Sequence, residues 1–248
     1  MQKRHAATIN FAKEIGQGYA SIRHHQALVI AAERGNVPRR EIQIHQRFFM
    51  HDIEAFILAG GASRRMGTDK SQLVLGDVPL IQRIKNTLAS VAKRVAVVGS
   101  RDKDDPNVVP DVYPHWGALG GIHGALTTCN SEWAIVVACD LPFVTSELVT
   151  QLINLQNRHE AVVPIQPDDR PQPLCALYRV DPCLQRAVEL IEAGRRRPLD
   201  LLEVVRTRWV AFSELAHLEH SANFFVNINT PEDYYEATQK ASAHKDLS

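Results

Sequence analysis

The sequence has no excess of charge of either sign, because 28 lysines and arginines balance 28 aspartates and glutamates over 248 residues. A neutral chain does not attract nucleic acid over a broad surface, so any phosphate that it binds must be held by locally placed donors. No apolar run approaches the roughly 20 residues that span a bilayer, and the N-terminus lacks the hydrophobic stretch of a signal peptide. Repeats and low-complexity tracts are also absent. These absences predict a soluble, cytoplasmic protein that binds neither nucleic acid nor a membrane.

Cysteine and histidine lack the spacings that are typical of metal sites. The four cysteines, Cys129, Cys139, Cys175 and Cys183, include no C-x-x-C pair, and two of them lie in hydrophobic, strand-like runs. The 11 histidines form no H-E-x-x-H or comparable pattern. We therefore interpret the cysteines as buried reduced thiols and the histidines as surface or packing residues.

The first 49 residues differ in composition from the rest of the chain. They are rich in His, Arg and Gln and contain no motif, and Met50 directly precedes a segment that looks like the start of a domain. We predict an N-terminal extension of unknown role over residues 1–49, either an appended tail or the product of an upstream start codon. Residues 50–248 are expected to form one domain, since 45% of the chain is hydrophobic and this length provides an ample core.

From about residue 53, short apolar runs alternate with helical patterns. The predicted strands are 53–58, 94–98, 133–139, 161–163, 174–178, about 209–212 and 224–228. The predicted helices are 79–91, about 122–128, 145–155 with Thr145 or Ser146 as its cap, 181–194, and one that starts at 230. Many strands are wholly apolar, which is typical of parallel strands buried on both faces. The sequence therefore predicts an α/β fold: a single Rossmann-like domain with a mostly parallel sheet, helices on both faces, and ligands at the carboxyl ends of the strands.

Glycines and basic residues follow the first predicted strand, in the string L-A-G-G-A-S-R-R-M-G-T-D-K over residues 58–70. Gly60 and Gly61 allow a sharp turn and a close approach to a ligand, and N–H groups in such a turn point at phosphate oxygens. Arg64, Arg65 and Lys70 supply positive charge for a triphosphate. The string is neither a P-loop nor a dinucleotide-binding fingerprint. Two glycines alone would favour a plain tight turn, whereas the whole string favours a triphosphate site.

This string resembles the signature of the molybdenum cofactor guanylyltransferase family, and the resemblance extends over about residues 53–240. Members of that family transfer GMP from GTP to molybdopterin, which forms the guanine dinucleotide cofactor and releases pyrophosphate. The resemblance implies that GTP is bound by the loop residues Leu58, Ala59, Gly60 and Gly61. It also implies that Lys70 reaches the phosphates, and we expect Lys70 and Arg64 to take part in catalysis.

Asp140 follows the predicted strand 133–139 in the string C-D-L-P-F. A carboxylate at the carboxyl end of a strand, braced by Pro142, is well placed to hold Mg²⁺ against phosphate oxygens. In the family, the matching aspartate binds the metal and the nucleotide. An aspartate that begins a turn before proline is common, so Asp140 alone leaves both interpretations open. Its expected place opposite the phosphate loop favours the metal, and Mg²⁺ is the cofactor that we predict.

Asp111, in the string V-V-P-D, precedes the glycine-rich string G-A-L-G-G-I over residues 117–122. The family has an aspartate here that contacts GTP, then a turn that opens a helix; a solvated loop aspartate is the alternative. Most members have proline where this chain has Ala118, so we expect a looser turn. The asparagine that some members carry near the ribose is missing from residues 98–100, which leaves the ribose contact unassigned.

Three further segments resemble the family. The string P-Q-P-L-C-A-L-Y-R, over residues 171–179, borders the acceptor pocket there. The string R-R-R-P-L, over residues 195–199, matches a basic stretch, in which we assign Arg196 to the acceptor's phosphate; a solvated charge run is the alternative. N-I-N-T-P-E-D, over residues 227–233, matches the closing motif. Asn227 and Asn229 are expected on one face of an extended segment, where Asn229 offers an amide oxygen to the metal or acceptor. The same string predicts a strand-to-helix junction capped by Thr230.

These features predict an in-line attack of the acceptor's phosphate oxygen on the α-phosphorus of GTP. The nucleophile is already anionic, so no general base is required. The cytidylyltransferase sister family is the first alternative, but its loop usually has L-A-A-G where this chain has L-A-G-G. Sugar-1-phosphate nucleotidyltransferases and a regulatory nucleotide-binding module without turnover are the others. The predicted partners are GTP and molybdopterin, with transient contact to molybdoenzymes or their chaperones.

Overall fold

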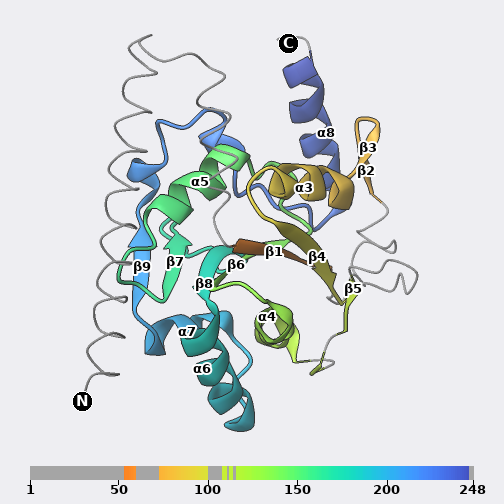
Figure 1. The fold of residues 1–248 in the computed structure, drawn as a ribbon. Coiled ribbons are helices and arrows are strands. Elements are labelled where there is room, and N and C mark those ends of the chain that lie inside the picture. Colours follow the sequence, from red (N-terminus) through yellow and green to blue (C-terminus); the bar gives the residue numbers. More distant parts are fainter. Residues whose placement is uncertain (1–52, 60–72, 100–107, 111, 114–115, 246–248) are drawn as a thin grey trace, which may run out of the picture. The chain divides into compact units, whose positions relative to one another are not determined.

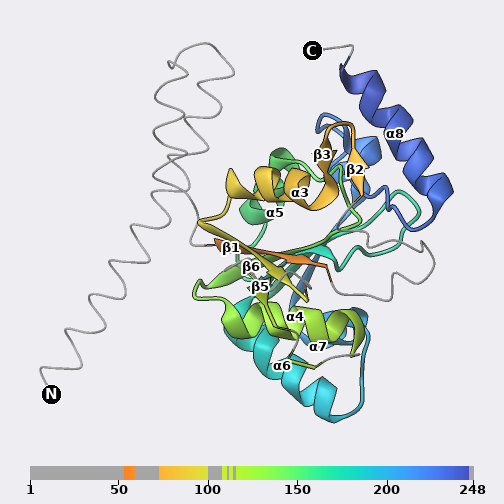
Figure 2. The same cartoon turned by 90° about the vertical axis from the view of Figure 1, so that its right-hand side faces the viewer.

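The computed structural model describes residues 53–59, 73–99, 108–110, 112–113 and 116–245. These residues form a layered α/β domain, in which a seven-stranded sheet lies between two groups of helices (Figures 1 and 2). The predicted extension over residues 1–49 lies outside the described residues. Within the described part of the chain, no helix is long and apolar enough to cross a membrane.

The sheet is mostly parallel. Its strands are β1 (Ile53–Leu58), β4 (Arg94–Val98), β5 (Val108–Val109), β6 (Trp133–Ala138), β7 (Ala161–Pro164), β8 (Cys175–Arg179) and β9 (Thr207–Val210), in the order β5-β4-β1-β6-β8-β7-β9. A separate hairpin is formed by β2 (Val74–Leu75) and β3 (Val78–Pro79). Strands β5, β4, β1 and β6 pair in parallel, and β9 pairs in parallel with β7. Only β8 runs antiparallel to its neighbours β6 and β7 among the pairings described.

Helices cover both faces of this sheet. They are α3 (Leu80–Ala89), α4 (Gly117–Thr128), α5 (Ser146–Asn154), α6 (Val180–Glu192), α7 (Pro198–Val204) and α8 (Pro231–Lys245), with short 3-10 turns η3 (Phe212–Glu214) and η4 (Ser221–Asn223). Figure 2 shows α3 and α5 on one face and α4, α6 and α7 on the other. Every residue of β1 and β6 is buried because both faces are covered, which explains why these strands are apolar runs rather than alternating patterns. The predicted fold class is confirmed.

Most predicted elements agree with the structure to within a few residues. Thr145 is the cap of α5, since its Oγ1 accepts a hydrogen bond from the N–H of Leu148 at 3.3 Å. The predicted strand at 224–228 is wrong: the segment follows η4 as irregular chain, although Phe224 and Ile228 are fully buried. Burial produces the same apolar pattern in an irregular segment as in a strand. The strand predicted at 209–212 ends at 210, and helix α7 was not predicted.

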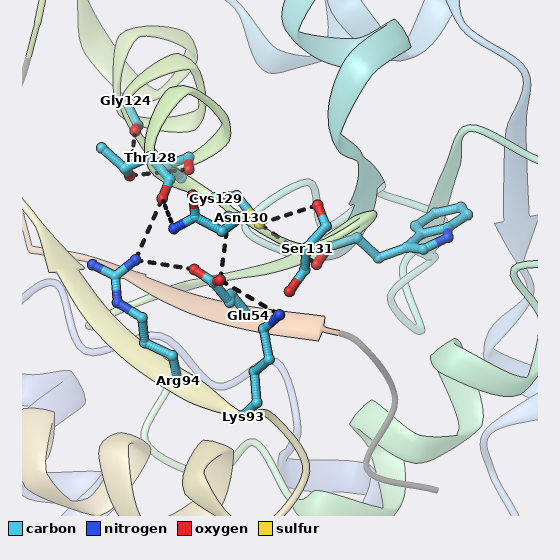
Figure 3. Close-up of polar contacts among 10 residues, drawn as sticks. Glu54, Lys93, Arg94, Gly124, Thr128, Cys129, Asn130 and Ser131 are labelled. Carbon is cyan, nitrogen blue, oxygen red and sulfur yellow. Dashed lines mark hydrogen bonds and ion pairs between the residues drawn. The ribbon is translucent and has the colours of Figure 1, made fainter.

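A buried carboxylate joins β1 to its neighbours at the amino-terminal edge of the sheet (Figure 3). Glu54 is only 2% exposed, and it accepts hydrogen bonds from Arg94 Nη1 at 3.0 Å and from the N–H of Asn130 at 3.2 Å. Lys93 Nζ lies 3.9 Å from the same carboxylate. Arg94 also donates to the carbonyl oxygen of Thr128 at 3.3 Å. This Glu54 cluster ties β1 and β4 to the end of α4.

All four cysteines are free thiols. Three of them are buried, as predicted, and burial raises the pKa of Cys175 and of Cys183 to about 12. Cys129 is only partly buried, and burial raises its pKa to about 11. The thiols of Cys129, Cys175 and Cys183 are therefore protonated at neutral pH.

Candidate functional site

Strands β4, β1 and β6 end side by side at the carboxyl edge of the sheet. Hydrogen bonds continue past their last residues, from the N–H of Ala59 to the Val98 oxygen at 3.0 Å and from the N–H of Cys139 to the Leu58 oxygen at 3.1 Å. The start of the glycine-rich string and Asp140 therefore follow two adjacent strands, β1 and β6. Because the sheet already uses the Ala59 N–H, that group is not a donor for a nucleotide.

Five of the predicted site residues cannot be placed in this geometry. Residues 60–72 and 111 lie outside the described residues. They include the predicted nucleotide-binding and catalytic residues Gly60, Gly61, Arg64, Lys70 and Asp111.

A segment distant in sequence reaches Asp140. The N–H of Ile228 donates to the carbonyl oxygen of Asp140 at 3.0 Å, which places Asn227 and Asn229 on either side of this hydrogen bond. Ile228 is fully buried, in an apolar cluster with Phe143 and with residues of β2, α3 and α8. The cluster anchors the segment beside the end of β6, while the carboxylate residue stays partly exposed. The structure thus brings together Asp140 and the two asparagines of the predicted site.

The junction that follows Asn229 caps helix α8. The Asp233 carboxylate accepts hydrogen bonds from the N–H groups of Asn229 at 2.8 Å and Thr230 at 2.9 Å, and the Asp233 N–H donates to Thr230 Oγ1 at 3.1 Å. These reciprocal bonds satisfy donors at the helix start and confirm the predicted cap. They also fix the backbone at Asn229, on which its side-chain direction depends.

Helix α4 approaches the end of β1 through small residues. A Cβ on Gly121 would lie 3.1 Å from Cδ1 of Leu58, so glycine allows the helix to pack closely against this strand. The helix begins at Gly117, whose φ of +69° favours glycine, and this start is earlier than predicted. Ala118 lies in the first helical turn, so the chain forms a regular helix here without the proline of the family. A looser turn than in the family stays a prediction.

The string 171–179, which we predict to border the acceptor pocket, also begins at the carboxyl edge of the sheet. The oxygen of Leu174 accepts a hydrogen bond from the N–H of Ala138 at 2.8 Å, which places the string 171–174 beside the end of β6. Gln172 is buried, and its N–H donates to the Pro164 oxygen at 2.9 Å. The string is therefore a neighbour of Asp140 in space.

The three consecutive arginines after α6 have three different environments. Arg195 forms two hydrogen bonds with the buried carboxylate of Asp200, at 3.1 and 2.6 Å, and its guanidinium lowers the pKa of Asp200. The Arg196 guanidinium lies 4.6 Å from the centre of the Trp116 ring. Arg197 immediately precedes α7. Arg196 lies at the start of α4, on the face of the sheet that this helix covers.

Trp116 is the residue of this edge that sequence analysis missed. Its indole Nε1 donates to the Arg195 carbonyl oxygen at 2.9 Å, and its ring supports Arg196. The only local signal is an aromatic residue directly before a glycine-rich turn. The contact joins Trp116 to Arg195, 79 positions later in the chain, and such a distant contact produces no periodic pattern in the sequence around either residue.

The oxygen donors at Asp140 fit a hard divalent cation. In the described part of the chain, no group of three or more His, Cys, Asp or Glu side chains could hold a metal. A single carboxylate, completed by substrate phosphates and water, is the usual arrangement for Mg²⁺ in enzymes that act on nucleotides. Asp140 after the end of a buried strand matches this arrangement, and Asn227 and Asn229 flank the residue that hydrogen-bonds to its backbone.

Comparison with known proteins supports the same chemistry. A family model described as the MobA-like NTP transferase domain matches residues 55–207. A probable molybdenum cofactor guanylyltransferase from Pelotomaculum thermopropionicum is 34% identical over 185 residues, which cover 73% of this chain and 89% of that protein. The molybdenum cofactor guanylyltransferase from Vibrio vulnificus is 30% identical over 183 residues, which cover 71% of this chain and 90% of that protein.

Solved structures agree with these sequence relatives. The molybdopterin-guanine dinucleotide biosynthesis protein A from Archaeoglobus fulgidus superposes with a TM-score of 0.66 at 26% identity, covering 77% of this chain and 99% of that one. The 2-C-methyl-D-erythritol 4-phosphate cytidylyltransferase from Thermus thermophilus shares the fold, with a TM-score of 0.57 at 17% identity and coverage of 76% and 98%. Since the family model matches more than half of the chain, this protein belongs to the MobA-like NTP transferases, a family of nucleotidyltransferases.

Proposed function

We propose that this protein is a molybdenum cofactor guanylyltransferase, which transfers GMP from GTP to molybdopterin and releases pyrophosphate. The observation that carries the proposal is the convergence of Leu58, Asp140 and the 227–229 segment at one edge of the sheet. The names of the relatives from P. thermopropionicum and V. vulnificus support guanine as the base and molybdopterin as the acceptor.

Nucleotidyltransferases of this family generally use a divalent metal ion. The proposed ion is Mg²⁺, held by the Asp140 carboxylate, with Asn229 as a neighbouring amide donor. Such an ion, when bound, neutralises charge on the phosphates of the nucleotide. The Ile228 N–H hydrogen-bonds to the Asp140 carbonyl oxygen, which restrains the backbone that carries this carboxylate.

The proposed GTP site consists of Leu58, Ala59, Gly60, Gly61 and Asp111. Leu58 and Ala59 lie at the end of β1, beside the proposed metal ligand. The proposed roles of the other three, and of Arg64 and Lys70 as phosphate-binding and catalytic residues, are supported by the sequence string and by membership of the family. Fixed positive charges at the β- and γ-phosphates stabilise the negative charge that develops on pyrophosphate.

In the proposed reaction, a phosphate oxygen of molybdopterin attacks the α-phosphorus of GTP. A bond forms between that oxygen and the α-phosphorus, while the bond to the oxygen that bridges the α- and β-phosphates breaks. The electron pair of the broken bond leaves with pyrophosphate. Because the attacking phosphate is already ionised, no residue has to remove a proton from it. The protein orients the two substrates, and Arg196 is the proposed acceptor-binding residue.

A purified sample of the full chain tests this function through pyrophosphate release. We expect release only when GTP, Mg²⁺ and molybdopterin are all present, and omission of any one should abolish it. GTP binding without release would support the regulatory-module alternative instead. Faster release with CTP would support the cytidylyltransferase alternative. Transfer of the product through transient contacts with molybdoenzymes or their chaperones is a further proposal, which a pull-down with the loaded protein would test.

A further inference from the structure

Trp116 makes two separate contacts with the arginine stretch. The face of its ring lies against the Arg196 guanidinium, 4.6 Å from the ring centre, and its Nε1–H donates to the Arg195 oxygen at 2.9 Å. The side chain of residue 196 and the backbone of residue 195 are thus both held by one indole.

The indole is itself held in place by its surroundings. The N–H of Trp116 donates to the Tyr113 oxygen at 3.0 Å, and the two rings are 6.4 Å apart. A Cβ on Gly120 would lie 2.9 Å from the Trp116 Cβ, so the first turn of α4 packs tightly against this residue. Because backbone and helix restrain the tryptophan, it provides a rigid surface for an exposed arginine.

Stacking leaves the hydrogen-bonding edge of Arg196 available. A guanidinium that lies on an aromatic ring uses its face, whereas its N–H donors point outward in its own plane. Within the described ranges, no carboxylate lies within 4.0 Å of Arg196, in contrast to Arg195, which is paired with Asp200. The planar donors of Arg196 match the geometry of a phosphate group.

Arg196 lies beside the start of α4. A Cβ on Gly117 would lie 3.8 Å from the Arg196 carbonyl oxygen, so the arginine stretch touches the first residue of this helix. Helix α4 also contacts Leu58, the start of the proposed GTP site, through Gly121. The stacked guanidinium is therefore connected to the proposed nucleotide site through one short, rigid helix.

We propose that Trp116 is a positioning residue for the transfer reaction, which holds Arg196 in the orientation that binds the phosphate of the acceptor. The proposal rests on the proposed function, in which Arg196 binds that phosphate. A flexible arginine loses side-chain entropy when it binds a ligand, and stacking removes much of this loss in advance. Trp116 should therefore act on the acceptor and not on GTP.

A double-mutant cycle tests the proposal. We expect Trp116→Ala and Arg196→Ala each to raise the KM for molybdopterin about tenfold, the loss of one charge-assisted contact, with the KM for GTP unchanged. Because Trp116 acts through Arg196, the double variant should be no worse than Arg196→Ala alone. The control is Trp209→Ala, since Trp209 is exposed on the edge strand β9. Its KM values should equal those of the wild type.

Other outcomes would contradict the proposal. Additive losses in the double variant, or an equal rise in the KM for GTP, would show that Trp116 does not act through Arg196. If Trp116→Ala fails to fold, Trp116→Leu keeps apolar volume without the aromatic face and completes the same cycle. A wild-type protein that forms no pyrophosphate with molybdopterin would contradict the proposed function itself, whereas an active wild type with an additive cycle would contradict only the role of Trp116.

Discussion

Asp140 has a backbone role that is separate from its proposed chemical role. Its carbonyl oxygen accepts the Ile228 N–H at 3.0 Å and so ties the end of β6 to the closing segment of the domain. Its carboxylate, by contrast, is partly exposed at the edge where the proposed nucleotide site lies. A substitution that changes only the carboxylate should therefore affect the reaction without unfolding the protein.

Asp140→Asn is predicted to lower kcat about 1000-fold, because metal stabilisation of phosphate charge contributes several kcal/mol. The melting temperature should stay within about 2 °C of the wild type, since the backbone hydrogen bond is retained. Pyrophosphate release and a thermal melt measure the two effects. Asp181→Asn, an exposed aspartate in the first turn of α6, is the matched control and should be fully active. Near-normal magnesium-dependent activity of the Asp140 variant would refute its assignment as the metal ligand.

Sequence alone could predict Asp140 but not Trp116, for a physical reason. Asp140 ends an apolar run, and the carboxyl ends of parallel strands meet at one edge, so local pattern and fold class were enough to place it. Trp116 acquires its environment from Arg195 and Arg196, which reach it only after α6 has folded back across the sheet. Nothing in the composition of either segment specifies that contact.

At the scale of elements, the junction between α6 and α7 contains an ion pair between the exposed Arg195 and the buried Asp200. Asp200 is 5% exposed, and the hydrogen bonds and charge of Arg195 lower its pKa. A carboxyl whose pKa is lower in the folded protein stabilises the fold above its unfolded pKa, about 3.9. That contribution is lost as the pH falls through the folded pKa.

Asp200→Asn should therefore destabilise the protein at pH 6 and much less at pH 3. Urea unfolding of both proteins at the two pH values measures the difference in free energy of unfolding. The difference should shrink as the pH falls below about 3.9, because the carboxyl of the unfolded chain then takes up a proton before that of the folded protein does, which offsets the advantage of the ion pair. A difference that stays constant between the two pH values would show that the ion pair is not its source.

The Glu54 cluster provides a second prediction at this scale. Arg94→Ala leaves a carboxylate that is 2% exposed without its closest cationic partner. We expect a loss of about 2 kcal/mol in free energy of unfolding, below the usual cost for a fully buried pair because the arginine is partly exposed. Chemical denaturation measures it, and Arg158→Ala, at an exposed site, should change stability by less than about 0.5 kcal/mol. Equal effects of the two substitutions would contradict the account of this cluster.

The sequence predicted an element correctly where the buried apolar run is also a regular strand or helix. Strand β1 and strand β4 match their predicted ranges because each is an apolar run followed by glycine or a small residue. The segment 224–228 is also mostly apolar, but it does not pair with a strand of the sheet. Phe224 and Phe225 belong to an apolar cluster with residues of α3 and α5, and Ile228 belongs to a cluster with Leu75 of β2. An apolar sequence indicates that a segment is buried, but it does not show whether the segment is a paired strand or an irregular chain.

At the scale of the whole domain, the sheet brings together segments from both of its faces. Figure 2 shows α3 and α5 on one face of the sheet and α4 and α6 on the other. The 227–229 segment reaches Asp140 through the Ile228 N–H, whereas Trp116 and Arg196 lie at the start of α4. The alternation of strands and helices was sufficient to predict this layered architecture. It could not predict which loops meet there, because loop contacts depend on how each helix returns across the sheet.

The most direct test of the central claim is the identity of the dinucleotide formed when GTP and CTP compete. The full chain is incubated with Mg²⁺, molybdopterin and equal concentrations of both nucleotides, and the products are identified by mass spectrometry. The account predicts molybdopterin guanine dinucleotide as the main product, in amounts equal to the pyrophosphate released. A cytosine dinucleotide as the main product, or no dinucleotide at all, would contradict it.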